Sequence, residues 1–142
     1  MAYQPLHERL PKVAEKETRV MTVFNSPDLP NGLYALVEAY CNDPSCDCRR
    51  VFFNVLSLEK KEVLAVIAYG WGSREHYIEW FGEENPQMIR EMQGPILNRG
   101  SHQSELAPAL LEKVKIILQD KKYVERLKRH YRMFRDTIDD EP

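Results

Sequence analysis

The hydrophobic periodicity of the chain changes once, near Ser73, and this change restricts the fold more than any other feature of the sequence. Four short runs rich in Val, Ile, Phe and Tyr precede it, at 20–24, 33–40, 51–58 and 63–69. Such runs, separated by turn residues, are typical of β-strands, and their short connections predict a four-stranded antiparallel meander. After Ser73 the apolar residues recur at helical spacing. Strands first and helices afterwards predict an α+β fold in which helices cover one face of the sheet.

Capping residues divide the second half of the chain into helices. Ser73 is suited to cap a short helix that ends at Gly82, and Asn85-Pro86 can start another that ends near Gly94-Pro95. Two longer apolar stripes follow: Leu106, Leu110, Val114 and Ile117, and then, after Asp120, Tyr123, Leu127, Tyr131, Phe134 and Ile138. We expect these two stripes to form a helical hairpin packed on the sheet.

The chain is long enough to form a core of ordinary size, because 43% of its 142 residues are hydrophobic. Residues 1–142 are therefore predicted to form a single domain, with 1–17 and 136–142 loosely ordered. The first residues lack the apolar core of a signal peptide, and no run approaches the roughly 20 apolar residues that span a bilayer. We expect a cytoplasmic protein that does not associate with membranes.

Three cysteines lie close together and point to a metal site. Cys41, Cys46 and Cys48 fall within one eight-residue run, and the chain contains no other cysteine. An odd number of cysteines cannot pair off internally, whereas three thiolates on one turn can surround an ion such as Zn²⁺. Their spacing differs from the paired Cys-x2-Cys of zinc ribbons and from plant-type iron–sulfur proteins. We predict zinc, with an iron–sulfur cluster, copper or a metal-free turn as alternatives.

A tetrahedral site needs a fourth ligand, and the sequence leaves its identity open. The predicted meander returns the chain near His76 to the end of the sheet that carries the cysteines. His130 lies beside the apolar stripe of the last predicted helix, and His102 lies in a loop. His7, a carboxylate of Asp43 or Asp47, or water are further candidates. Arg49 and Arg50, which follow the last cysteine, are expected to neutralise the thiolates or to donate hydrogen bonds to them.

The stretch 40–51, together with Tyr69-Gly70-Trp71 and His130-Tyr131, resembles a group of small prokaryotic proteins with a Cys-x4-Cys-Asp-Cys-Arg turn that binds zinc. The resemblance covers about half of the chain. It implies that the cysteine turn is a unit, and it implies no activity, because that group carries none that is established.

The remaining features favour a binding protein over an enzyme. The chain lacks the phosphate-binding loop, the nucleophile elbow, the His-Glu-x2-His pair and the zinc-deaminase signature. Segment 113–135 has a net charge of +7 within a chain of net charge −2, which suggests nucleic-acid binding through Lys128, Arg129, Arg132 and Arg135, although a solvated helix face explains the same pattern. We expect a structural zinc site in a binding or interaction module, whose partner is another protein or a second copy. A hydrolytic or redox metalloenzyme and a nucleic-acid-binding module are the alternatives.

Overall fold

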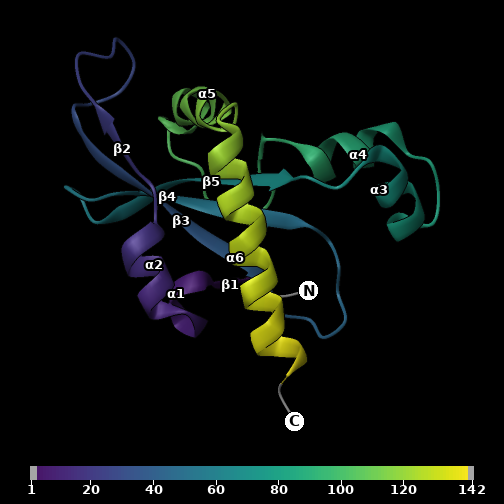
Figure 1. Cartoon of the computed structure of the whole chain (residues 1–142). Coiled ribbons are helices and arrows are strands. Elements are labelled where there is room, and N and C mark those ends of the chain that lie inside the picture. Colours follow the sequence, from purple (N-terminus) through teal and green to yellow (C-terminus); the bar gives the residue numbers. More distant parts are fainter. Residues whose placement is uncertain (1–2, 141–142) are drawn as a thin grey trace.

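An antiparallel sheet of six strands is the frame of the computed structural model, which describes residues 3–140 (Figure 1). The strands are β1 (Tyr3–Pro5), β2 (Val20–Val23), β3 (Gly32–Cys41), β4 (Arg50–Ser57), β5 (Glu62–Gly70) and β6 (Ile96–Leu97). Their order across the sheet is β1-β3-β4-β5-β6. β2 pairs with the first half of β3, and β1 pairs with its last three residues, so β1 and β2 share one edge of β3. The predicted α+β class is confirmed.

The predicted four-stranded meander is wrong in the number of its strands, and the order across the sheet differs because β1 shares the edge of β3 with β2. The four predicted runs correspond to β2, β3, β4 and β5, which pair antiparallel in sequence order. β1 and β6 are additional strands of three and two residues. A strand this short cannot display an alternating pattern, so its pairing is determined by neighbouring backbone rather than by its own sequence.

The helices are α1 (Leu6–Arg9), α2 (Pro11–Glu17), α3 (Arg74–Phe81), α4 (Pro86–Gln93), α5 (Ala107–Ile117) and α6 (Lys121–Asp139). The predicted caps of α3 and α4 are confirmed. The Ser73 side chain accepts a hydrogen bond from the amide of His76, and Gly82 ends α3 with a left-handed φ of 94°. The Asn85 side chain accepts one from the amide of Met88 at the start of α4. No helix in the described part of the chain is long and apolar enough to cross a membrane.

α5 and α6 cross instead of forming the predicted side-by-side hairpin. Figure 1 shows α5 almost end-on and α6 along its length. α5 contacts β5 and β6, whereas α6 contacts α1 and β4. The two helices therefore run in different directions, and each packs its apolar stripe on the sheet.

The N-terminal segment, which we expected to be loosely ordered, contributes to the sheet and the core. Residues 3–17 form β1, α1 and α2, and Leu6 is fully buried. The ring of Tyr3 lies 3.9 Å from the ring of Phe52, centroid to centroid. At the other end α6 continues to Asp139, and residues 1, 2, 141 and 142 lie outside the described residues.

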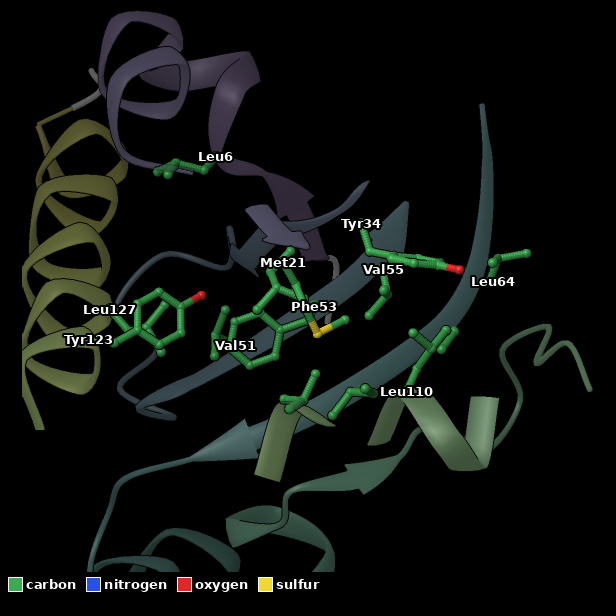
Figure 2. Packing of buried hydrophobic residues seen from close by; sticks show 14 of the residues in the cluster. Leu6, Met21, Tyr34, Val51, Phe53, Val55, Leu64, Leu110, Tyr123 and Leu127 are labelled. Atoms are coloured by element: carbon green, nitrogen blue, oxygen red, sulfur yellow. The ribbon is translucent and has the colours of Figure 1, made fainter. Parts of the chain in front are cut away.

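β4 shows which face of the sheet the helices cover. Val51, Phe53 and Val55 are fully buried, while the residues between them are only partly buried. Figure 2 shows these three side chains on the side of the sheet where Leu110 of α5 and Leu127 of α6 lie. The core therefore fills the space between one sheet face and these helices, and α6 reaches the end of the sheet where β3 turns into β4.

A buried polar network joins α2, β3 and α6. Glu38 of β3 is almost fully buried, and its Oε1 accepts a hydrogen bond from Tyr40 Oη (2.6 Å) and lies 2.7 Å from His130 Nδ1. The other ring nitrogen of His130 lies 3.3 Å from Glu17 Oε1. Glu17 also forms an ion pair with Arg129. His130, which lies beside the apolar stripe of α6 as expected, is fully buried, but its partners are carboxylates rather than a metal site.

Replacement of His130 by Ala should lower the free energy of unfolding by about 3 kcal/mol, because it leaves the buried Glu38 carboxylate without its main partner. Urea unfolding of both proteins at neutral pH measures this difference. His102→Ala, in an exposed loop, is the matched control and should change stability by less than about 0.5 kcal/mol. Equal stability of the two variants would contradict the role assigned to His130.

Glu17 should make part of the stability dependent on acid pH. The hydrogen bond from Arg129 is the main cause that lowers the pKa of Glu17 from 4.5 to about 2, and His130 acts in the same direction. Since the folded-state pKa is lower than the unfolded one, this contribution is complete above pH 4.5 and is lost as the pH falls toward 2. Arg129 is half-exposed, so we expect about 1 kcal/mol.

Urea unfolding of Glu17→Gln and the unchanged protein between pH 2 and 6 tests this expectation. The difference between their stabilities should be largest above pH 4.5 and should shrink as the pH falls. A difference that does not vary with pH would show that Glu17 contributes nothing through its charge.

Candidate metal centre

The turn between β3 and β4 brings the three predicted cysteines together. Cys41 ends β3, and Cys46 and Cys48 lie in the loop that follows. Their Sγ atoms all lie within 4.8 Å of one another. Two sulfurs bound to the same tetrahedral Zn²⁺ at 2.3 Å are separated by about 3.8 Å, so a small contraction of the cluster is enough to hold the ion. Cys41 and Cys48 are buried, whereas Cys46 is partly exposed.

The local sequence explains the tight turn. The amide of Cys46 donates a hydrogen bond to the carbonyl oxygen of Asp43 (3.3 Å), which closes a turn through Pro44 and Ser45. Ser45 adopts a left-handed φ of 61°. The amide of Asp43 donates to the Sγ of Cys41 at 3.5 Å, which is the kind of contact that stabilises a thiolate.

Helix α6 holds the loop at both ends. The guanidinium group of Arg135 donates to the carbonyl oxygens of Cys41 and Asp43, each at 2.8 Å. The Tyr131 hydroxyl donates to the Asp47 carboxylate (3.0 Å) and accepts from the amide of Arg49 (3.2 Å). α6 therefore fixes the path of the backbone on both sides of Cys46.

Helix α3 holds the same loop from another side. His76 Nε2 lies 2.9 Å from the carbonyl oxygen of Asp47, and the Tyr77 hydroxyl lies 2.9 Å from that of Cys48. A Cβ atom at Gly72 would come within 2.6 Å of the His76 ring and 2.8 Å of the Tyr77 ring. Glycine at this position therefore permits the close approach of α3. α3 and α6 together hold the loop through these hydrogen bonds.

The surroundings of the thiols favour their neutral form in the absence of a cation. Burial raises the pKa of Cys41 to about 11 and raises the pKa of Cys46 and of Cys48. Thiolates at these positions need a positive charge close by, and a bound divalent ion supplies it.

Tyr3 is a site residue that the sequence did not reveal. Its hydroxyl lies 3.6 Å from the Sγ of Cys48, because the pairing of β1 with β3 places Tyr3 opposite Cys41. Burial raises the pKa of Tyr3, so the phenol remains a hydrogen-bond donor to the sulfur. No feature of the sequence could have identified it, because the three residues of β1 carry no pattern of their own.

The side chains of the arginines that follow the cysteines do not have the expected role, whereas the backbone amide of Arg50 does donate a hydrogen bond to the Cys48 thiol. Arg49 forms an ion pair with Asp47 (3.0 Å), and Arg50 donates to the carbonyl oxygens of Met92 and Glu91. Arg50 thereby joins β4 to α4. Their guanidinium groups are directed to these partners rather than to the thiols.

The four histidines proposed as the fourth ligand lie in different parts of the structure, and His7 is exposed on α1. His76 is next to the loop, but its Nε2 contacts the Asp47 carbonyl. His130 is bound to Glu38 in the core. His102 is exposed in the loop before α5. In this loop the backbone amide of Ser104 donates to the carbonyl oxygen of Leu64, which lies at the end of β5 far from the cysteines. Among the described residues, the cysteines are the one cluster of His, Cys, Asp or Glu ligand atoms close enough to hold an ion.

A cavity of about 330 Å³ opens beside Cys46. Its lining residues are Ser45, Cys46, Asp47, Arg49, His76, Glu79 and Trp80. Cys41 and Cys48 do not belong to the lining. Water or another small molecule that approaches the cluster through this cavity therefore meets Cys46 first.

Removal of the Tyr131 hydroxyl should weaken metal binding by the cluster about tenfold, because the two hydrogen bonds that fix the loop on either side of Cys48 are lost. Competition with a chromophoric chelator measures the affinity of Tyr131→Phe. Tyr34→Phe is the matched control: it deletes a hydroxyl that bonds the Pro30 carbonyl at the other end of β3, and it should leave the affinity unchanged. Equal affinities of the two variants would show that α6 does not organise the site.

Comparisons with known proteins identify no relative. No family model, curated protein or solved structure matches the chain. The resemblance to small prokaryotic proteins with a zinc-binding cysteine turn therefore stays a prediction. The three adjacent cysteines can bind a metal ion, and this conclusion rests on their geometry alone.

Proposed function

We propose that the protein binds one zinc ion through Cys41, Cys46 and Cys48, and that the ion stabilises the loop of a binding or interaction module. The observation that carries the proposal is the approach of the three Sγ atoms to within 4.8 Å in a loop held by α3 and α6. Tyr3, as a donor to Cys48, has the role that hydrogen-bonding groups around metal ligands commonly have.

The donor set favours zinc over an iron–sulfur cluster. Iron–sulfur clusters usually need four cysteine ligands, and the chain contains three. Copper(I) also prefers thiolates, so the choice between zinc and copper is left to elemental analysis. We also propose that the protein resides in a reducing compartment such as the cytoplasm, where thiols remain available to a metal.

A metalloenzyme is the second candidate, because the cavity beside Cys46 gives small molecules access to a cluster that has three protein ligands. Three thiolates reduce the Lewis acidity that a water-activating zinc needs, and for this reason a structural role is preferred.

Nucleic-acid binding has weaker support, since several of the basic residues that suggested it have other partners. Arg135 is buried against the cysteine loop, Arg129 pairs with Glu17, and Lys128 pairs with Glu125. Arg129 and Arg132 are the exposed members of the four. A protein partner or a second copy of the chain is therefore the partner we propose.

Elemental analysis of protein purified without added metal tests the zinc proposal. We expect close to one zinc per chain and three thiols that react slowly until a chelator removes the metal. Detection of iron together with a visible absorption band would indicate that the site is a redox centre and not a zinc site. A metal-free protein with three freely reactive thiols would refute the proposal.

Cys46→Ser should lose most of its zinc and part of its stability. At a free zinc concentration about 100 times the dissociation constant, the ion adds about 2.7 kcal/mol to the free energy of unfolding. In excess chelator the variant and the unchanged protein should be equally stable to within about 1 kcal/mol, because the loop is held by protein groups. If the variant is equally stable in zinc as well, the ion has no structural role.

A further inference from the structure

The three thiols of the cluster differ in their access to small molecules. Cys41 and Cys48 are fully buried. Cys46 is partly exposed and is the one cysteine that lines the 330 Å³ cavity. The cavity is bordered by polar and charged side chains, so that water and small polar solutes can occupy it.

We propose that Cys46 is a site of modification by hydroperoxides, and that its oxidation releases the metal by forming a disulfide with Cys41. This inference rests on the proposed zinc site and adds to it a reactive residue, a class of reactant and a mode of regulation. Thiolate character and exposure together determine which cysteine of a protein is oxidised first. A metal supplies thiolate character to all three sulfurs, whereas the cavity gives access to Cys46 alone.

The reaction needs one hydroperoxide per chain. The Cys46 thiolate attacks one peroxide oxygen, the O–O bond breaks, and this oxygen remains on sulfur as a sulfenic acid while the other leaves as an alkoxide or hydroxide that solvent protonates. The Cys41 thiolate then attacks the sulfenic sulfur, an S–S bond forms, and hydroxide leaves and is protonated. The two thiolates lose two electrons and the hydroperoxide gains them. Zinc keeps its charge and is left with Cys48 as its one protein thiolate.

Cys41 is the expected partner because of the way the loop is held. A disulfide between Cys46 and Cys48 would have to close across the single residue Asp47. The carbonyl oxygen of Asp47 contacts His76, and its carboxylate contacts Arg49 and Tyr131. Cys41 faces Cys46 across the turn, with its Sγ within 4.8 Å of that of Cys46. Four residues separate this pair, so its closure requires a shift of the turn 42–45, which Arg135 holds at the carbonyl oxygen of Asp43.

The sequence permits a direct experiment on the zinc-loaded full chain. Hydrogen peroxide is added in about tenfold excess, zinc release is followed with a chromogenic chelator, and remaining thiols are alkylated at intervals. Cleavage before Asp43 and before Asp47 places the three cysteines in three different peptides. We expect zinc release to parallel the loss of two thiols, a disulfide between the peptides of Cys41 and Cys46, and an alkylated Cys48.

Substitution of each cysteine provides the controls. Cys46→Ser should lose its remaining thiols at least about ten times more slowly. Cys41→Ser cannot form the disulfide, so a sulfenic acid on Cys46 should accumulate and react with a dimedone-type probe. Cys48→Ser should still form the disulfide. Each variant is tested at a zinc concentration that saturates its site, because loss of the metal would by itself return the thiols to their neutral, slowly oxidised form.

The outcomes separate this inference from the zinc proposal. A protein that contains no zinc before peroxide is added refutes the proposed function. A zinc-loaded protein that keeps its metal under peroxide, or whose first oxidised residue is Cys41 or Cys48, refutes only the role of Cys46.

Discussion

The contact between α6 and β3 supports both the core and the cysteine loop. Two consecutive residues of α6 divide these tasks: His130 contacts the buried carboxylate of Glu38, and Tyr131 contacts the loop through Asp47 and Arg49. One turn later, Arg135 binds the backbone at the end of β3. A shift of α6 along the sheet would therefore disturb a buried ionisable pair and the cysteine cluster together, and the cost of exposing or unpairing Glu38 opposes such a shift.

The sequence predicted those features that depend on local pattern. A few consecutive residues are enough to indicate each of these features: the alternation in β4, the caps at Ser73 and Asn85, and the closeness of the cysteines. The sequence could not predict the short strands β1 and β6, because three and two residues are too few to show a period. It also gave no indication that α5 and α6 cross, since their apolar stripes indicate burial but not the direction in which each helix lies.

The sequence identified the candidate ligands of the site but not the residues that hold those ligands in place. Cys41, Cys46 and Cys48 are recognisable by type and spacing. Tyr3, which lies beside Cys48, comes from a strand 45 residues earlier, and Arg135 comes from a helix 94 residues after Cys41. Contacts of this kind depend on tertiary structure, which one sequence does not reveal. Of the contacts expected between the thiols and Arg49 or Arg50, the backbone amide of Arg50 makes one, to Cys48. Their guanidinium groups instead contact Asp47 and the end of α4, which proximity in sequence did not indicate.

The dependence of the loop on α6 has a consequence for the order of events during biosynthesis. The groups that fix the carbonyl oxygens of Cys41 and Asp43 are separated from them by more than 90 residues. While the ribosome is still making the segment between them, the cysteines are part of a chain that has no pre-organised site. A metal ion captured at that stage is held by a loose, exchangeable set of thiols. If the cluster binds the metal we propose, selective loading has to wait until α6 has emerged and docked.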